Sequence, residues 1–332
     1  MKLEELLKKA VSQRASDIHF KVGEPPVVKL FGELFGIKSA PIKPNQINEL
    51  VQTVLDGKSQ KPPFTFDEML TTMAIEGVGR FRVNIYRCRG EYSISIRCVP
   101  MEIPVFETLN IPKSILEFTK KSSGIVFISG GCGSGKTTTI SSVVEYMNHN
   151  RKGHIVLIQE PIEFIHKDAR CIINQREIGF DTKSVEISIT NASRHHCDII
   201  GIDETINEFQ LATLFRAAES GKLVFATIKT PTVIETLAKI MNAFSNTNRD
   251  IATQIITRNL LGIVSQKLIK RKDRSGEIPA VEILINNQTI SSAIRDNRLD
   301  DIEELMSAES DENGMTTFGQ SIEKLRKIGV ID

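Results

Sequence analysis

Tryptophan is absent from the 332 residues, and aromatic residues together make up only 6%. A surface that stacks the bases of single-stranded nucleic acid needs several aromatic rings, so this composition argues against one. The net charge is only +1, from 42 basic and 41 acidic residues, whereas a protein that coats DNA or RNA needs a basic excess. The sequence therefore predicts no nucleic-acid partner.

The five cysteines are scattered, and no two of them form a C-x-x-C pair. A disulfide framework or a four-cysteine zinc site is therefore not expected. No apolar run approaches the roughly 18–20 residues that span a bilayer, and the first ten residues mix charge with leucine, unlike a signal peptide. We expect a protein of the reducing cytoplasm.

The chain is long enough for two domains of roughly 150 residues each. Its first part has the alternating runs of strands and the amphipathic spacing of helices. We expect strands at 17–22, 27–34, 81–87 and 92–99, and helices at 3–14 and 46–55. These elements predict a small α+β domain over residues 1–99, and the three prolines within 100–112 predict a linker.

Residues 113–332 show a different pattern. Short apolar runs alternate with helix-like segments, which is typical of a parallel sheet in an α/β domain. The runs lie at 125–129, 154–158, 198–202 and 223–227, and helical patterns lie at 137–149, 208–218, 233–243, 251–270 and 300–330. The predicted fold class of this larger domain is α/β.

The strongest signal is the octapeptide GGCGSGKT at 130–137, which fits the P-loop pattern G-x-x-x-x-G-K-[ST] between a strand and a helix. Glycines let backbone N–H groups surround a phosphate, and the following helix presents its positive end to it. Lys136 is expected on the β and γ oxygens and Thr137 on Mg²⁺. Cys132 either fills a variable position or is a reactive thiol. The predicted ATP-binding residues here are Gly130, Gly131, Cys132, Gly133, Ser134, Gly135, Lys136, Thr137 and Thr138.

A second nucleotide element follows the apolar run at 198–202, which ends in Asp203 and Glu204. In P-loop motors, carboxylates at such a strand end bind the Mg²⁺ shell and activate the attacking water. Glu204 is the predicted catalytic residue. Asp203 is either a second ligand or a solvated strand end.

Several stretches across the full length resemble type IV pilus retraction ATPases of the PilT kind, within the secretion-ATPase superfamily. Besides the P-loop they are ASDIH at 15–19, RFRVN at 80–84, PIEF at 161–164, NQRE at 174–177, AAESG at 217–221 and IVSQKL at 263–268. The resemblance implies a PAS-like N-terminal domain, a RecA-like ATPase domain over 113–332, and a homohexamer with ATP and Mg²⁺ between subunits. It also implies an inner-membrane pilus platform as partner, and a cytoplasmic protein held at that membrane through partners.

The family's functional residues carry over to matching positions. Glu204 matches the catalytic glutamate, and Glu163 matches the last acidic residue of the family's acidic box. The implied catalytic residues are therefore Glu204 and Glu163, and these two with Thr137 are the implied Mg²⁺ ligands, partly through water. The residues that match phosphate-binding positions outside the P-loop are Arg82, Arg97, Arg194 and Lys229.

The sequence also departs from the family pattern. The acidic box usually reads Glu-Asp-Pro-Ile-Glu, but residues 159–163 read QEPIE, so Gln159 is an amide where the family has a carboxylate. The two histidines of the family's histidine box are replaced by Lys222 and Lys229. Lysine is a fixed cation without an acceptor, so Lys229 is expected to clamp the γ-phosphate. The stretch TISSAIRD at 289–296 differs from the family's retraction motif.

Two hypotheses follow. In the first, the chain is a retuned motor in which Glu204 and Glu163 activate water and domain rotation pulls on the platform. In the second, it is a paralogue that binds ATP, hydrolyses it slowly and serves an active paralogous ATPase as partner or regulator. A type IV secretion ATPase of related fold and a RecA-like nucleic-acid motor remain alternatives, and stimulation of hydrolysis by DNA or RNA would identify the last.

Overall fold

The computed structural model describes residues 3–13, 15–30, 33–55, 64–99, 102–205, 207–244, 249–273, 276–308 and 314–332. The chain divides into two compact units. Unit 1 consists of Met1–Glu102 together with Pro161–Ile165, and unit 2 consists of Ile103–Glu160 and His166–Asp332.

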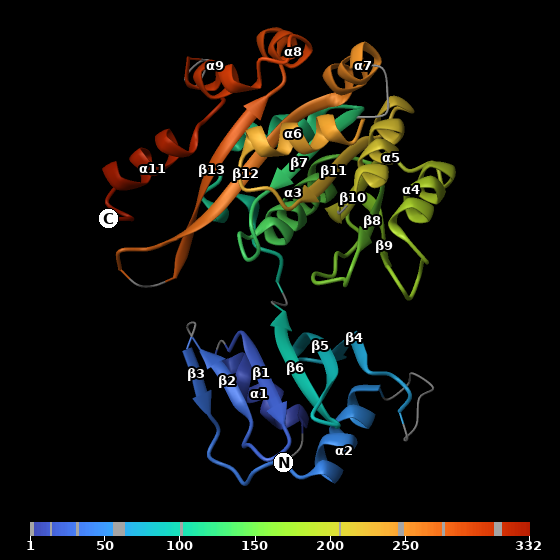
Figure 1. The fold of residues 1–332 in the computed structure, drawn as a ribbon, viewed down its shortest axis with the longest axis vertical. Helices are drawn as coiled ribbons and strands as arrows, with labels where there is room; N and C mark the ends of the chain where they lie inside the picture. Colours follow the sequence, from blue (N-terminus) through green and yellow to red (C-terminus); the bar gives the residue numbers. More distant parts are fainter. Residues whose placement is uncertain are drawn as a thin grey trace. The chain divides into compact units, whose positions relative to one another are not determined.

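Unit 1 is an antiparallel sheet with strand order β3-β2-β1-β6-β5-β4, accompanied by two helices (Figure 1). The strands are β1 Asp17–Lys21, β2 Val27–Leu30, β3 Glu33–Gly36, β4 Glu68–Ile75, β5 Gly79–Cys88 and β6 Glu91–Val99; the helices are α1 Leu3–Ser12 and α2 Pro44–Leu55.

Alternation along the strands of unit 1 separates an apolar face from a polar one. Phe81, Val83 and Ile85 of β5 are fully buried in one core with the apolar sides of α1 and α2. Their neighbours in sequence, such as Arg82, point to the other face because successive side chains of a strand alternate. The predicted α+β character of this part is confirmed, whereas the PAS-like assignment and the boundaries 1–99, 100–112 and 113–332 stay predictions.

One predicted strand was wrong in extent. The run at 27–34 forms two strands, β2 and β3, that pair antiparallel with each other, and residues 31–32 between them lie outside the described residues. All four residues of β3 are exposed, so this strand lacks the alternation of apolar and polar residues from which its limits could be predicted. Strand β4 was missed because its residues are mostly exposed or half-buried and show weak alternation.

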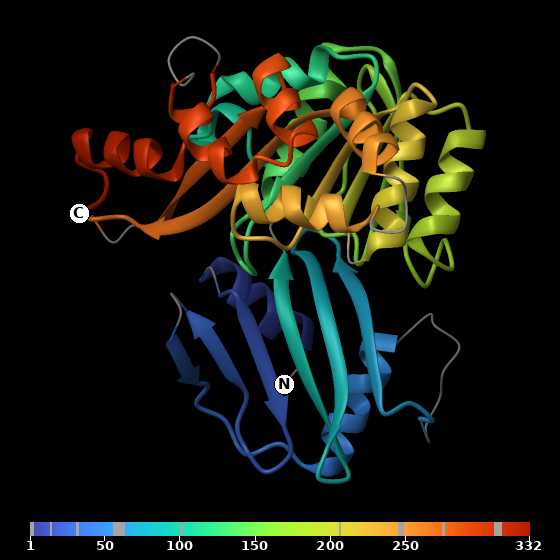
Figure 2. The ribbon, with the colours of Figure 1, turned by 45° about the horizontal axis from the view of Figure 1, so that its top comes forward.

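Unit 2 contains a seven-stranded sheet with order β13-β12-β7-β11-β10-β8-β9, in which only the pairing of β12 with β13 is antiparallel (Figure 2). The strands are β7 Gly124–Ser129, β8 Gly153–Gln159, β9 Cys171–Glu177, β10 Ile199–Thr205, β11 Leu223–Ile228, β12 Leu260–Lys270 and β13 Glu277–Ile285. This confirms the predicted α/β fold with a parallel sheet.

Helices cover both faces of this sheet (Figures 1 and 2). On one face, Val126 and Ile128 of β7 pack with α3; on the other, Ile125 and Phe127 pack in the core that contains α4 to α8. The α-helices of unit 2 are α3 Lys136–Asn150, α4 Val185–Arg194, α5 Glu208–Glu219, α6 Val233–Asn242, α7 Arg249–Asn259, α8 Gln288–Arg295, α9 Ile302–Ala308 and α11 Phe318–Lys327; the 3₁₀ helices are η1 Phe106–Leu109, η2 Lys113–Lys120 and η3 Leu299–Asp301.

The helix predicted over 251–270 was wrong in its second half. Helix α7 ends at Asn259, and Leu260–Lys270 is strand β12, which pairs with β7 on one side and β13 on the other. Its first part is buried on both faces, and a strand buried in this way shows no alternation from which sequence could distinguish it from a helix. Residues 100–101 of the predicted linker and 309–313 of the predicted helix at 300–330 lie outside the described residues. Among the described residues, no helix is long and apolar enough to cross a membrane.

Candidate functional site

The P-loop connects the central strand β7 to helix α3, whose first residue is Lys136. Gly131, Cys132 and Gly133 are exposed, whereas Ser134 and Lys136 are buried. The Lys136 ammonium donates to the carbonyl oxygens of Gly130 and Gly131, each at 2.8 Å. Burial lowers the pKa of Lys136, and the carboxylates of Glu204 and Asp203 oppose that shift. The loop therefore holds its lysine at the start of the helix, where the helix dipole also favours anions.

Three glycines of the P-loop have backbone conformations that favour glycine, and Gly133 is one of them with φ +73. Gly130 has φ +150, and a β-carbon there would overlap the backbone oxygen of Gln266 and the hydroxyl of Ser134. Gly135 has φ +87, a left-handed value that favours glycine. A β-carbon on Gly131 meets nothing within 4 Å. The first of the two adjacent glycines is thus the structural one.

The side-chain amide of Gln266, in β12, makes one hydrogen bond to the P-loop and one to the first turn of α3. Its Nε2 donates to the carbonyl oxygen of Ser134 at 2.5 Å, and its Oε1 accepts from the hydroxyl of Thr139 at 2.9 Å. One residue earlier, the Ser265 hydroxyl lies 2.6 Å from that of Ser129, at the end of β7. Gln266 is only 2% exposed. Sequence reasoning included this residue in a family-like stretch but gave it no role, because its contact is with a loop 132 positions away.

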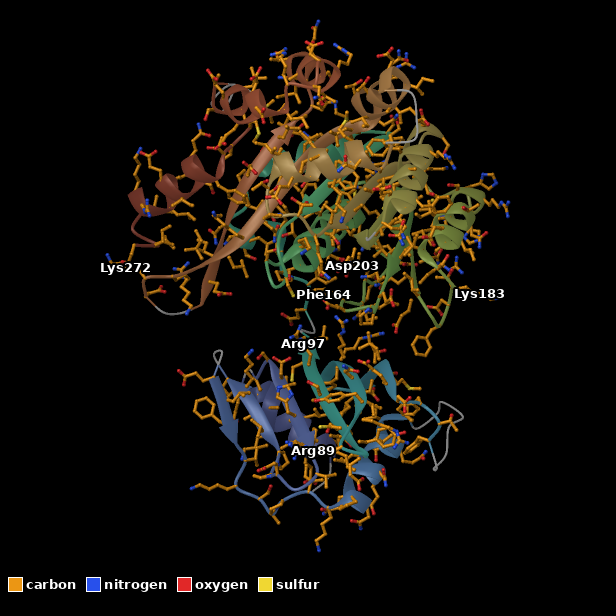
Figure 3. All side chains as sticks on the ribbon, in the orientation of Figure 1. Arg89, Arg97, Phe164, Lys183, Asp203 and Lys272 are labelled. Atoms are coloured by element: carbon orange, nitrogen blue, oxygen red, sulfur yellow. The ribbon has the colours of Figure 1, made fainter. Side chains whose placement is uncertain are left out.

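Asp203, labelled in Figure 3, lies near the carboxyl end of β10. The Thr137 hydroxyl is 3.4 Å from each carboxylate oxygen of Asp203. Thr227 of the neighbouring strand β11 donates its hydroxyl to Asp203 at 3.2 Å. Two roles for Asp203, a metal ligand or a solvated strand end, are compatible with the sequence. In the structure the Asp203 side chain faces Thr137 of the P-loop.

Glu204, the next residue, has a left-handed backbone with φ +64. Its N–H donates to the hydroxyl of Thr227 at 2.6 Å, and the register between β10 and β11 shifts between Ile202 and Thr205. The Glu204 carboxylate forms an ion pair with the Lys229 ammonium, whose Nζ lies 2.6 Å from Oε1. Lys229 directly follows β11, so the two side chains extend from the ends of adjacent parallel strands.

Lys222 and Lys229, the two lysines in the predicted histidine box, lie at opposite ends of β11. The Lys222 carbonyl accepts from the N–H of Gly124 at the start of β7, whereas the P-loop follows the other end of β7. Of the two, only Lys229 is therefore at the P-loop edge of the sheet.

Unit 1 brings together the predicted residues Arg82, Arg97 and Glu163. Arg82 and Arg97 are directly opposite each other on β5 and β6 (Arg97 is labelled in Figure 3). Arg82 Nη1 lies 3.8 Å from Glu163 Oε1, and Arg97 Nε lies 2.9 Å from Asp17 Oδ1. Burial raises the pKa of Glu163, although both arginines act to lower it. Two cations and two carboxylates thus share the polar face of this sheet.

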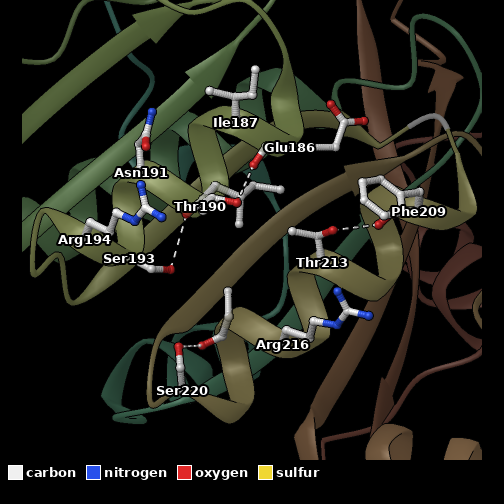
Figure 4. A pocket seen from close by; sticks show the side chains of 12 residues that line it. Glu186, Ile187, Thr190, Asn191, Ser193, Arg194, Phe209, Thr213, Arg216 and Ser220 are labelled. Atoms are coloured by element: carbon white, nitrogen blue, oxygen red, sulfur yellow. Dashed lines mark hydrogen bonds between the residues drawn. The ribbon is translucent and has the colours of Figure 1, made fainter.

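Arg194 lies apart from the P-loop of its own chain. Helix α4 ends at Arg194, and the chain then enters β10 at its amino end, whereas the P-loop follows the carboxyl end of a parallel strand. Arg194 lines a groove of about 610 Å³ between α4 and α5, together with Thr190 and Arg216 (Figure 4). Ile187 and Phe209, 47% and 62% exposed, also line this groove.

Gln159, the amide in the predicted acidic box, is 4% exposed at the end of β8. Its Oε1 accepts from Gln175 Nε2 at 2.8 Å. It borders a cavity of about 10 Å³ that Asp203 and His166 also line. The amide of Gln159 therefore lines the same cavity as the Asp203 carboxylate, where a second negative charge would repel Asp203.

The chain is similar to known secretion ATPases over its full length. The family model for type II/IV secretion system proteins matches residues 67–321. The type IV pilus ATPase PilU of Pseudomonas aeruginosa is 30% identical over 331 residues, which cover 100% of this chain and 86% of PilU. The type IV pilus retraction ATPase PilT of the same organism is 30% identical over 90% of this chain and 87% of PilT.

Solved structures show the same fold. The crystal structure of the pilus retraction motor PilT with bound ADP superposes with a TM-score of 0.89 at 33% identity, covering 100% of this chain and 95% of that one. The ATPase DotB of Legionella pneumophila has a TM-score of 0.82 at 23% identity, over 99% of this chain and 92% of DotB, and supports the fold alone. The chain therefore belongs to the type II/IV secretion system protein family, as a PilT-like secretion ATPase.

Proposed function

We propose that this protein is an ATP-hydrolysing motor subunit of a type IV pilus machine. The observation that carries the proposal is the convergence of Lys136, Thr137, Asp203 and Glu204 at one edge of the parallel sheet of unit 2. The full-length similarity to PilU and PilT, and the ADP in the PilT structure, support a nucleotide as the ligand.

The chemistry assigns separate tasks to these residues. Backbone N–H groups of 130–136 and the Lys136 ammonium would bind phosphate oxygens and orient the terminal phosphate. The hydroxyl of Thr137 and the carboxylate of Asp203 are hard oxygen donors that fit Mg²⁺, which would neutralise charge on the phosphates. Glu204 would accept the proton of the attacking water. In this proposal the carboxylate that binds Mg²⁺ is that of Asp203 rather than Glu204, because Asp203 lies beside Thr137.

The predicted site residues outside the P-loop cluster would reach the nucleotide only when several copies of the chain assemble. We propose that the chain forms a homohexamer with ATP between subunits, in which Arg82, Arg97 and Glu163 approach the phosphates. Arg194 would serve the nucleotide of a neighbouring subunit, since it lies at the opposite end of the sheet from its own P-loop. The proposed partners are further copies of the chain and the membrane platform of the pilus.

A second candidate is an accessory paralogue that hydrolyses ATP slowly. Two observations favour slow hydrolysis: the amide at Gln159 and the ion pair that engages Glu204 with Lys229. A carboxylate that is paired with a cation must leave that cation before it can accept a proton from water. Both candidates share one ATP site, so they differ in rate and in partner rather than in chemistry.

The test is Mg²⁺-dependent ATP turnover by the purified full chain, alone and mixed with an active paralogue from the same cell. Turnover that disappears in Glu204→Gln supports the motor, and stimulation only in the mixture supports the accessory role. Measurement of the native mass in the same samples tests the hexamer. Absence of ATP binding at millimolar Mg²⁺ would overturn both candidates, and stimulation by DNA or RNA would favour a nucleic-acid motor.

A further inference from the structure

The ion pair between Glu204 and Lys229 conflicts with the role of general base that the proposed function gives Glu204. A general base needs an available lone pair, yet Glu204 Oε1 lies 2.6 Å from the Lys229 ammonium. The pair is half-exposed, with side-chain exposures of 35% for Glu204 and 53% for Lys229. Water can therefore reach both groups, and the pair can open at modest energetic cost.

Local backbone structure directs the Glu204 side chain to this partner. A left-handed backbone is unfavourable for glutamate, so surrounding contacts must hold it. The Thr227 hydroxyl supplies such a contact, since it accepts the Glu204 N–H and donates to Asp203. Thr227 lies near the end of β11 and Lys229 directly follows that strand, so the geometry of the ion pair depends on the pairing of β10 with β11.

The same ammonium lies within the electrostatic environment of the P-loop. Burial lowers the pKa of Lys136, the carboxylates of Glu204 and Asp203 oppose that shift, and the Lys229 ammonium adds to it. A terminal phosphate bound by Lys136 brings further negative charge into this environment. The Lys229 ammonium can then pair with either of two anions, the Glu204 carboxylate or the terminal phosphate.

We propose that Lys229 exchanges the Glu204 carboxylate for the terminal phosphate when a nucleoside triphosphate binds, and so releases Glu204 to act as the base. Lys229 is a positioning residue for Glu204 under this proposal. A nucleoside diphosphate lacks the competing group, so the ion pair persists with it. The inference rests on the proposed function and adds that the site distinguishes triphosphate from diphosphate through Lys229.

An equilibrium binding cycle tests the exchange without relying on turnover. Affinities for ADP and for a non-hydrolysable ATP analogue are measured with Mg²⁺ for the parent, Glu204→Gln, Lys229→Met and the double variant. In the parent background, Glu204→Gln removes the competitor for Lys229. The preference for triphosphate over diphosphate should then rise. We expect this rise to be about three- to fivefold larger than the rise that Glu204→Gln causes in the Lys229→Met background.

The sign of the difference separates the exchange from a simpler role. If Lys229 only neutralises Glu204 and never leaves it, Glu204→Gln has the larger effect in the Lys229→Met background, because the carboxylate there repels phosphate unscreened. An equal effect in both backgrounds means that the two residues are not coupled. Either of these results overturns the exchange while leaving ATP binding intact. A parent chain that binds neither nucleotide overturns the proposed function and the exchange together.

Two further variants control the cycle. Lys152→Met removes an exposed lysine before β8, at the edge of the sheet away from the P-loop, and should leave both affinities unchanged. Lys229→Arg keeps the charge and should retain more of the triphosphate preference than Lys229→Met. Loss of preference to the same degree in both variants would contradict a role that depends on the charge at this position.

Discussion

The hydroxyl of Thr137 faces the carboxylate of Asp203, at 3.4 Å from each oxygen. Thr137 is the second residue of α3 and Asp203 lies near the carboxyl end of β10, so the sheet brings together groups 66 positions apart. Hydroxyl and carboxylate oxygens are ligands that Mg²⁺ accepts alongside water and phosphate. This pair marks the proposed metal position more directly than Glu204 does.

Asp203→Asn should weaken ATP binding by about tenfold or more at millimolar Mg²⁺, because loss of a carboxylate near a bound metal removes charge that the metal requires. Without Mg²⁺ the difference should nearly vanish. Titration with a fluorescent ATP analogue, with and without a chelator, measures both. Asp300→Asn, an exposed aspartate of η3, is the matched control, and a loss independent of Mg²⁺ would contradict the metal role.

Gly130→Ala should abolish nucleotide binding and lower the free energy of unfolding by about 1–3 kcal/mol. Its new methyl group would overlap the backbone of Gln266, which cannot move aside cheaply. Gly131→Ala makes the same chemical change one residue later, where nothing lies within 4 Å. The expected result is near-parental binding by Gly131→Ala, measured together with urea denaturation of both variants; equal damage by the two would contradict the loop geometry.

Gln266→Met keeps the size of the side chain but leaves the Ser134 carbonyl and the Thr139 hydroxyl without their amide partner. A buried group that loses its hydrogen bond costs about 1–3 kcal/mol. We expect an unfolding free energy lower by this amount and weaker ATP affinity, because the P-loop loses its support. Gln254→Met, at an exposed position of α7, should change neither quantity.

Glu282 predicts a specific pH dependence of stability. Its Oε2 accepts the N–H of Val233 at the start of α6 at 2.8 Å, and burial raises its pKa above the ordinary value of 4.5. The folded protein therefore holds the Glu282 proton more tightly than the unfolded chain, and this residue's contribution to stability falls as pH rises from about 4.5 through the raised pKa.

Glu282→Gln removes the ionisation and keeps an acceptor for the Val233 N–H. The stability of this variant relative to the parent should increase with pH across that window and then level off, as measured by denaturation at a series of pH values. Glu277→Gln on the same strand controls for the loss of one charge from an exposed position. A stability difference that is constant with pH would contradict the raised pKa.

The sequence predicted the parts of the fold that repeat a strong local pattern. The P-loop, the strands β7, β8, β10 and β11, and the parallel α/β sheet all follow from apolar runs joined to recognisable turns. Strand β12 was predicted as helix because burial on both faces removes alternation. Strand β4 was missed for the opposite reason, since its exposed residues carry little pattern.

The candidate site was predictable where one local motif names the residue, as for Lys136 and Thr137. The support by Gln266 and the pairing of Glu204 with Lys229 depend on strands brought together by the sheet order, which no local spacing encodes. The left-handed backbone at Glu204 and the position of Asp203 beside Thr137 are also features that side-chain type alone does not predict. The roles assigned to Glu163, Arg82, Arg97 and Arg194 stay predictions.

The short segment Pro161–Ile165 belongs to unit 1 although it lies in sequence between β8 and β9 of unit 2. The polypeptide therefore passes from one unit to the other three times, after residues 102, 160 and 165. A recombination event that exchanged residues 1–102 alone would join a foreign sheet to the original Pro161–Ile165. An N-terminal unit taken from a relative would therefore keep all of its own residues only if the five residues at 161–165 came with it.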